Sequence, residues 1–181
     1  MLSGQLVLAV RVLTGIVFAV AAFGKLRSPR HFAGFVTSLA PLGVPASLRP
    51  AVAGAMAVAE AATVVLVALP GTVPVGLAAA AALLVVFCAG IAYAVRTGRA
   101  VPCHCFGSTG SELKTSHLVR NGMVAFAAAG ALAVDVSAPA GPVGAGAVTA
   151  SVLLGGFAAL AVLSWDALAT LLSPLYAGRD S

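Results

Sequence analysis

Charged residues are scarce in this sequence of 181 residues, of which 8% are charged and 61% are hydrophobic. Soluble domains carry about 25% charged residues, because their surface faces water. A chain with so little charge would expose apolar patches in water and aggregate, which excludes an ordinary soluble fold. Its continuous apolar runs match the roughly 20 residues that a helix needs to cross a bilayer. The predicted fold class is therefore all-α, an integral membrane helical bundle.

Cysteine is also rare, and three thiols are too few for a disulfide scaffold. The first residues lack the basic segment of a signal peptide, and their apolar stretch continues to Phe23 with Arg11 inside it. We therefore expect a retained first span. The net charge of +5 agrees with basic residues in cytoplasmic loops, and no nucleic acid partner is expected.

Apolar segments predict a single transmembrane domain over residues 1–181 that crosses the bilayer four or, in the favoured interpretation, five times. The expected spans are about residues 5–24, 50–69, 73–95, 117–136 and 143–165. After the first span, Ser28 and Pro29 are typical of a helix start. Apolar residues then recur at helical spacing: Phe32, Phe35, Val36 and Leu39. They predict an interfacial amphipathic helix over residues 28–40, with an ordered loop as the alternative.

The basic residues predict the orientation of the chain. Apart from Arg11, they lie in the links 25–49 and 96–120 and in the C-terminal tail. The opposite links, 70–74 and 136–142, contain none. Because cytoplasmic loops are enriched in Lys and Arg, we expect the N-terminus outside and both large links in the cytoplasm. The predicted location is the bacterial inner (plasma) membrane, with a multi-pass topology.

The link 97–116 contains the only cluster of reactive side chains in the sequence, Cys103, His104 and Cys105. Two thiols separated by one residue can form a disulfide, but the ring is small, and strained disulfides are easier to reduce. This pattern favours reversible exchange over permanent cross-linking. His104, together with Arg99, can stabilise the thiolate, which is the attacking species.

Two other interpretations of this cluster stay open. The pair can be chemically inert, or it can bind a metal, because Cys103, His104, Cys105 and His117 suit Cu(I) or Zn. Structural zinc sites space their first two cysteines by two to four residues, which disfavours a closed zinc site. Of the three interpretations of this cluster, reversible thiol–disulfide exchange is favoured.

Cys88 lies about 12 Å inside the third predicted span, at 1.5 Å per residue. It is either a small apolar filler or a resolving thiol for the cysteine pair.

Arg11 and Glu60 are the charges expected deepest in the membrane. Such charges face the bundle interior and have partners, so we predict an Arg11–Glu60 ion pair. This pair would be a structural clasp or part of a quinone or substrate pocket. Lys25, Arg120 and Asp166 are expected at the cytoplasmic interface, beside the cysteine cluster, as anchors, with a catalytic role as the alternative.

The order of these features resembles the MauE branch of the DoxX-like membrane proteins, over roughly residues 8–135. It is carried by an arginine in the first span, a glutamate in the second and four short motifs, Gly24-Lys25, Arg96-x-Gly98, Cys103-x-Cys105-Phe106-Gly107 and Arg120-Asn121. The family motif commonly reads Cys-Gly-Cys-Phe-Gly, and His104 replaces its middle glycine here. That departure leaves thiol exchange possible and favours a tuned thiolate or metal binding more than the usual motif does.

The resemblance implies a four-helix core, with the fifth span outside it, and a role in thiol–disulfide chemistry. MauE-like proteins are associated with maturation of methylamine dehydrogenase, where disulfides must form in a partner, and occur beside thioredoxin-like proteins. DoxX-like relatives are linked to sulfur oxidation and oxidative-stress defence. By position, Cys103 and Cys105 would be the redox pair. The polar framework would comprise Arg11, Lys25, Glu60, Arg120 and Asn121.

The leading hypothesis is a membrane thiol–disulfide oxidoreductase, or an accessory to one, that acts on a thioredoxin-like protein, another thiol protein or a small thiol. A quinone is the candidate cofactor. The first alternative is a carrier of soft metal ions such as copper or mercury, with copper or zinc held at the same loop. The second is a non-catalytic scaffold subunit.

Overall fold

The computed structural model describes residues 2–98, 115–137 and 144–165. Its elements are α1 (Leu2–Leu26), α2 (Pro29–Ser38), α3 (Arg49–Ala68), the 3₁₀ helix η1 (Pro70–Thr72), α4 (Val73–Arg96), α5 (Thr115–Ser137) and α6 (Ala145–Leu163). These ranges contain helices and no strand, which confirms the predicted all-α fold class.

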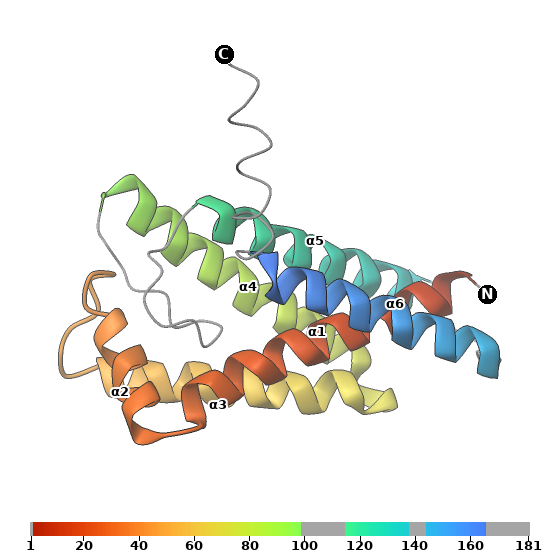
Figure 1. Ribbon diagram of the computed structural model, residues 1–181, viewed down its shortest axis with the longest axis horizontal. Coiled ribbons are helices and arrows are strands. Elements are labelled where there is room, and N and C mark those ends of the chain that lie inside the picture. The colour runs from red at the N-terminus through yellow and green to blue at the C-terminus, as the bar shows by residue number, and fades with distance from the viewer. Residues whose placement is uncertain (1, 99–114, 138–143, 166–181) are drawn as a thin grey trace, which may run out of the picture.

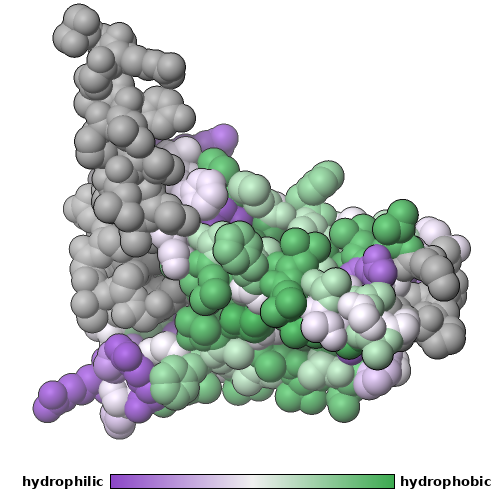
Figure 2. All heavy atoms as spheres, turned by 45° about the vertical axis from the view of Figure 1, so that its right-hand side comes forward, coloured by the Kyte–Doolittle hydropathy of each residue, from purple (hydrophilic) through white to green (hydrophobic). Residues whose placement is uncertain are grey.

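Five of the helical segments are long and apolar enough to cross a membrane: α1, α3, α4 together with η1, α5 and α6. The hydrophobic residues cover the middle of the face drawn in Figure 2, and strongly hydrophilic residues gather toward its ends. This distribution fits a bilayer, where apolar side chains face lipid and polar ones reach the interfaces. The chain is a multi-pass membrane protein with five candidate spans.

Helix α1 lies at the centre of the bundle and contacts α3, α5 and α6 along its length (Figure 1). Helix α4 packs between α3 and α5, so that α1, α3, α4 and α5 form a four-helix core. The middle of that core is filled by side chains from three of these helices, namely Phe18, Ala80, Leu84, Val124 and Ala128. Helix α6 lies outside the four and packs mainly against α1.

Helix α2 lies at the end of the bundle where α1 and α4 finish and α3 and α5 begin (Figure 1), which we call the α2 end. It begins as the sequence predicts, because the Ser28 side chain accepts a hydrogen bond from the backbone N–H of His31 and Pro29 is its first residue. Phe35 and Leu39, on its predicted apolar face, are buried with Ala53 of α3. These two side chains therefore contact the bundle.

Two glycines let helices approach closely. A Cβ at Gly76 of α4 would lie 2.7 Å from backbone atoms of Leu66 and Val67 in α3. A Cβ at Gly155 of α6 would collide with the backbone carbonyl oxygen of Ala9 in α1. Small residues are enriched at such crossings in membranes, because helices there associate through close packing rather than through the hydrophobic effect.

Candidate functional site

A buried ion pair joins α1 to α3 inside the core. Nζ of Lys25 lies 2.7 Å from Oε1 and 2.9 Å from Oε2 of Glu60, and donates to both. The two side chains are 1% and 0% exposed. Charges inside a membrane protein are expensive unless they are paired, so this contact is the strongest polar feature of the bundle interior.

The predicted Arg11–Glu60 pair is wrong, and the direction of helical side chains explains why. Side chains on a helix lean toward its N-terminus. Lys25, near the end of α1, therefore leans back into the bundle, and Glu60 on the antiparallel α3 leans toward the α2 end. The two meet, whereas Arg11 leans away from Glu60 toward the opposite end.

Arg11 instead caps the C-terminus of α3. Its Nε donates to the carbonyl oxygen of Val67 at 2.9 Å, and its Nη2 donates to that of Ala68 at 3.0 Å. The last carbonyl groups of a helix have no hydrogen-bond partners within the helix and lie at the negative end of its dipole. A guanidinium donates hydrogen bonds to them and places a positive charge beside them. Arg11 is thus a structural link between α1 and α3.

Two aromatic rings flank the Lys25 ammonium. Nζ lies 5.0 Å from the ring centroid of Phe35 on α2 and 5.7 Å from that of Phe87 on α4. Both distances are within the range of cation–π attraction. The expectation that Lys25 is an interfacial anchor is therefore wrong, because its charge is enclosed by a carboxylate and two rings. Sequence reasoning missed the two phenylalanines.

The start of α5 adds three buried polar side chains. His117 is 2% exposed, and Arg120 and Asn121 are each 3% exposed. Arg120 was also expected to be an interfacial anchor, and its burial contradicts that expectation. Asp166, the third expected anchor, lies outside the described residues.

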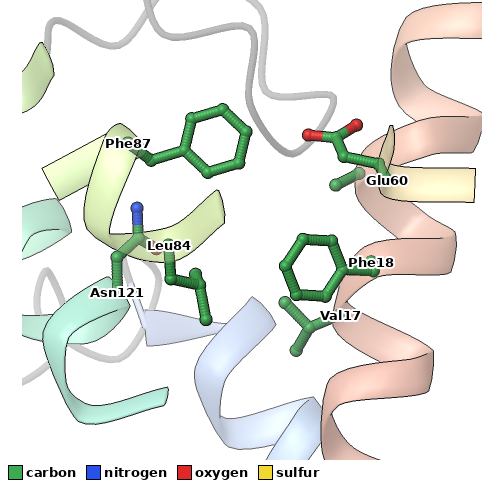
Figure 3. A pocket seen from close by; sticks show the side chains of 7 residues that line it. Val17, Phe18, Glu60, Leu84, Phe87 and Asn121 are labelled. Carbon is green, nitrogen blue, oxygen red and sulfur yellow. The ribbon is translucent and has the colours of Figure 1, made fainter. Parts of the chain in front are cut away.

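A small cavity lies between Glu60 and Asn121, with a volume of about 10 Å³. It is lined by side chains from all four core helices: Val17, Phe18, Ala21, Glu60, Leu84, Phe87 and Asn121. Figure 3 shows Glu60 and Asn121 on opposite sides, with Phe87 on one flank and Phe18 and Leu84 on the other. The volume suits about one water molecule. A cavity of this volume is too small for a quinone ring.

Cys88 is partly buried on α4, and its Sγ lies 3.8 Å from the backbone carbonyl oxygen of Leu118 on α5. This contact fits a small side chain at a helix interface and gives no redox partner among the described residues. Cys103, His104 and Cys105 lie outside the described residues. Of the suggested metal ligands, the structure places only His117, at the α2 end.

The chain matches a known protein family. The family model described as methylamine utilisation protein MauE matches residues 3–134. No curated protein and no solved structure matches the chain. The matched region contains the four core helices almost entirely and ends before α6 begins.

Proposed function

Because the chain belongs to the MauE family, whose model matches residues 3–134, we propose that it takes part in thiol–disulfide exchange at the membrane. It acts as an oxidoreductase or as an accessory to one. Cys103 and Cys105 are the exchanging pair, and His104 stabilises the thiolate.

The position of the buried charges is the observation that carries this proposal. Helix α4 ends at Arg96 and α5 begins at Thr115, both at the α2 end, so the segment that holds the cysteines is joined to the bundle there. Lys25 and Arg120 are buried in the same half of the bundle, and Glu60 is the only buried acidic side chain among the described residues. A buried lysine and a buried arginine thus lie in the half of the bundle to which the cysteine segment is joined, and basic side chains near a thiol favour its thiolate.

The exchange itself needs no resident metal or cofactor. The thiolate of one cysteine attacks a disulfide of a thioredoxin-like partner, forms a mixed disulfide and displaces one partner thiolate. The second cysteine then attacks the mixed disulfide and releases the partner as a dithiol. The pair loses two electrons, the partner disulfide gains them, and the protons of the two thiols end on the partner. The reverse reaction reduces the pair.

Alkylation trapping of the purified protein in redox buffers tests the proposal. The wild type should have two more alkylated thiols in reduced glutathione than in oxidised glutathione. The double variant Cys103→Ser/Cys105→Ser should show no such difference. Cys88→Ser is the matched control and should keep the shift. If Cys88, rather than the second cysteine of the pair, resolves the mixed disulfide, the Cys88→Ser variant should accumulate the mixed disulfide between the protein and glutathione.

Other outcomes would replace the proposal. A pair that never oxidises but binds copper or mercury stoichiometrically, with loss on His117→Ala, would make the protein a soft-metal carrier. If the activity of the protein in the cell is unchanged by the double variant Cys103→Ser/Cys105→Ser, the protein is a scaffold.

We also propose that the cysteine segment faces the cytoplasm of a bacterial cell. It lies in the link 96–120, which is rich in basic residues, and cytoplasmic links are enriched in Lys and Arg. A membrane-impermeant maleimide applied to intact spheroplasts should leave Cys103 and Cys105 unlabelled, and should label them after lysis. Labelling before lysis would reverse the orientation.

A further inference from the structure

Two exposed arginines lie at the turn between α1 and α2. Arg27 directly follows α1, and Arg30 lies in the first turn of α2. Figure 2 shows strongly hydrophilic residues projecting at its lower left, the corner at which α1 ends and α2 begins in Figure 1. We call Arg27 and Arg30 the arginine corner. It places two positive charges at one edge of the α2 end.

A chain of hydrogen bonds holds Arg27 in this turn. Its Nη2 donates to Nε2 of His31, because a guanidinium has donors and no acceptor. Nδ1 of His31 donates in turn to Oγ of Ser28 at 2.7 Å, the oxygen that also caps α2. A guanidinium has five N–H donors, so Arg27 keeps donors for an anion.

No carboxylate among the described residues neutralises the arginine corner. The acidic side chains in those ranges are Glu60 and Asp135. Glu60 is 0% exposed and accepts hydrogen bonds from Lys25 at both oxygens. Asp135 lies near the last residue of α5, at the end of the bundle opposite the α2 end. The two arginines are therefore open to an anion from elsewhere.

Large apolar side chains adjoin the arginine corner on α1. Phe23 and Leu26 are 68% and 55% exposed. The backbone N–H of Arg27 donates to the carbonyl oxygen of Phe23 at 2.9 Å, so helical spacing continues through Arg27. Residues three and four apart share one face of a helix, which places Phe23, Leu26 and Arg27 together. A positively charged surface thus borders an apolar one on the membrane-spanning side.

We propose that the arginine corner binds an anionic phospholipid. Arg27 and Arg30 donate hydrogen bonds to its phosphate, a group that guanidinium donors match well, and an acyl chain lies along Phe23 and Leu26. A soluble phosphate would engage only the arginines. A zwitterionic lipid would bring a positive charge of its own toward them. The bound lipid anchors α2 at the level of the headgroups, and this inference does not depend on the cysteines.

Native mass spectrometry of the full-length protein in detergent measures this binding. The probes are phosphatidylglycerol, which is anionic, and phosphatidylcholine with the same acyl chains, which is zwitterionic. The wild type should bind phosphatidylglycerol about 25-fold more tightly, because each basic residue at a membrane surface contributes about fivefold. Arg27→Gln/Arg30→Gln should abolish this preference. If that variant fails to fold by circular dichroism, Arg30→Gln, which keeps the contact between Arg27 and His31, decides with a loss of about fivefold.

Two further variants separate this surface from general charge and from phosphate binding. Arg96→Gln is the matched control, because it removes an exposed charge at the end of α4, on the other side of the α2 end in Figure 1. It should keep the wild-type preference. Phe23→Ala/Leu26→Ala keeps both arginines and should weaken the binding of phosphatidylglycerol, because the acyl chain then buries less apolar area.

The proposal is overturned if the wild type binds the two lipids equally. It is also overturned if Arg96→Gln loses the preference as fully as Arg27→Gln/Arg30→Gln, because charge spread over the whole end would then attract the lipid. A third contrary result is displacement of phosphatidylglycerol by an equal concentration of glycerol 3-phosphate, with no effect of Phe23→Ala/Leu26→Ala. The corner would then bind a free phosphate.

Discussion

Lys25 and Glu60 approach to 2.7 Å in the interior of the bundle, and neither side chain is more than 1% exposed. Each charge offsets the free-energy cost of burying the other, because removal of one leaves an uncompensated ion in a medium of low polarity. Phe35 of α2 and Phe87 of α4 complete the enclosure. The pair therefore connects α1 and α3 directly, and α2 and α4 through their rings.

Glu60→Leu should destabilise the protein by about 3–5 kcal/mol, because Lys25 remains buried without its partner. The measurement is thermal unfolding in detergent, followed by circular dichroism. The double variant Lys25→Met/Glu60→Leu is the matched control and should recover most of the loss, since apolar residues of similar size often replace a buried ion pair. A double variant as unstable as the single one would contradict this account.

Arg11→Leu should cost about 1–3 kcal/mol, because it removes two hydrogen bonds from a charged donor to the carbonyl oxygens of Val67 and Ala68. Arg11→Lys keeps the charge at the helix end and should lose less. Unfolding midpoints of the two variants in the same detergent make the comparison. Arg30→Leu, at an exposed position of α2, should change stability by no more than about 0.5 kcal/mol. Equal effects at Arg11 and Arg30 would refute the capping role.

Gly155→Ala should loosen α6 from α1, because the new methyl group would collide with the carbonyl of Ala9 and the side chain of Val12. Overpacking of this kind costs about 1–3 kcal/mol. The single tryptophan, Trp165, follows α6, so its emission should shift as the helix detaches. Gly156→Ala is the control, because a Cβ there meets no atom within 4 Å. No difference between the two would mean that this crossing is not tightly packed.

Phe35→Leu should cost about 0.5–2 kcal/mol through the lost attraction between the ring and the ammonium of Lys25. The same substitution in the Lys25→Met/Glu60→Leu background should cost less, and the difference isolates the cation–π contribution. Both are measured by thermal unfolding. Phe23→Leu, at a ring 68% exposed on α1, should have little effect. A cost at Phe35 that stays the same without the charge would assign its effect to packing alone.

The helices could be predicted from the sequence because a bilayer imposes one requirement on every span. Each span needs about 20 apolar residues, so composition alone indicates where the chain crosses. The start of α2 could be predicted as well, since Ser28 and Pro29 are a local capping signal. Such features depend on residues that are neighbours along the chain.

The partner of Glu60 could not be found from depth alone. Estimates at 1.5 Å per residue place Cα atoms and ignore the reach and lean of long side chains, which bring Lys25 rather than Arg11 to the carboxylate. The roles of Phe35 and Phe87 depend on how α2 and α4 pack, which apolar spacing does not specify. The cavity beside Asn121 is formed by four helices at once and has no local signal.

Helix α6 adds a fifth candidate membrane crossing to those of the four core helices. It begins after the family match ends and holds to the bundle mainly through α1. A chain with four crossings has both ends in the same compartment, whereas a fifth crossing moves one end to the other side. This single appended helix thus decides whether anything attached after it meets the same aqueous phase as the first residue or the opposite one.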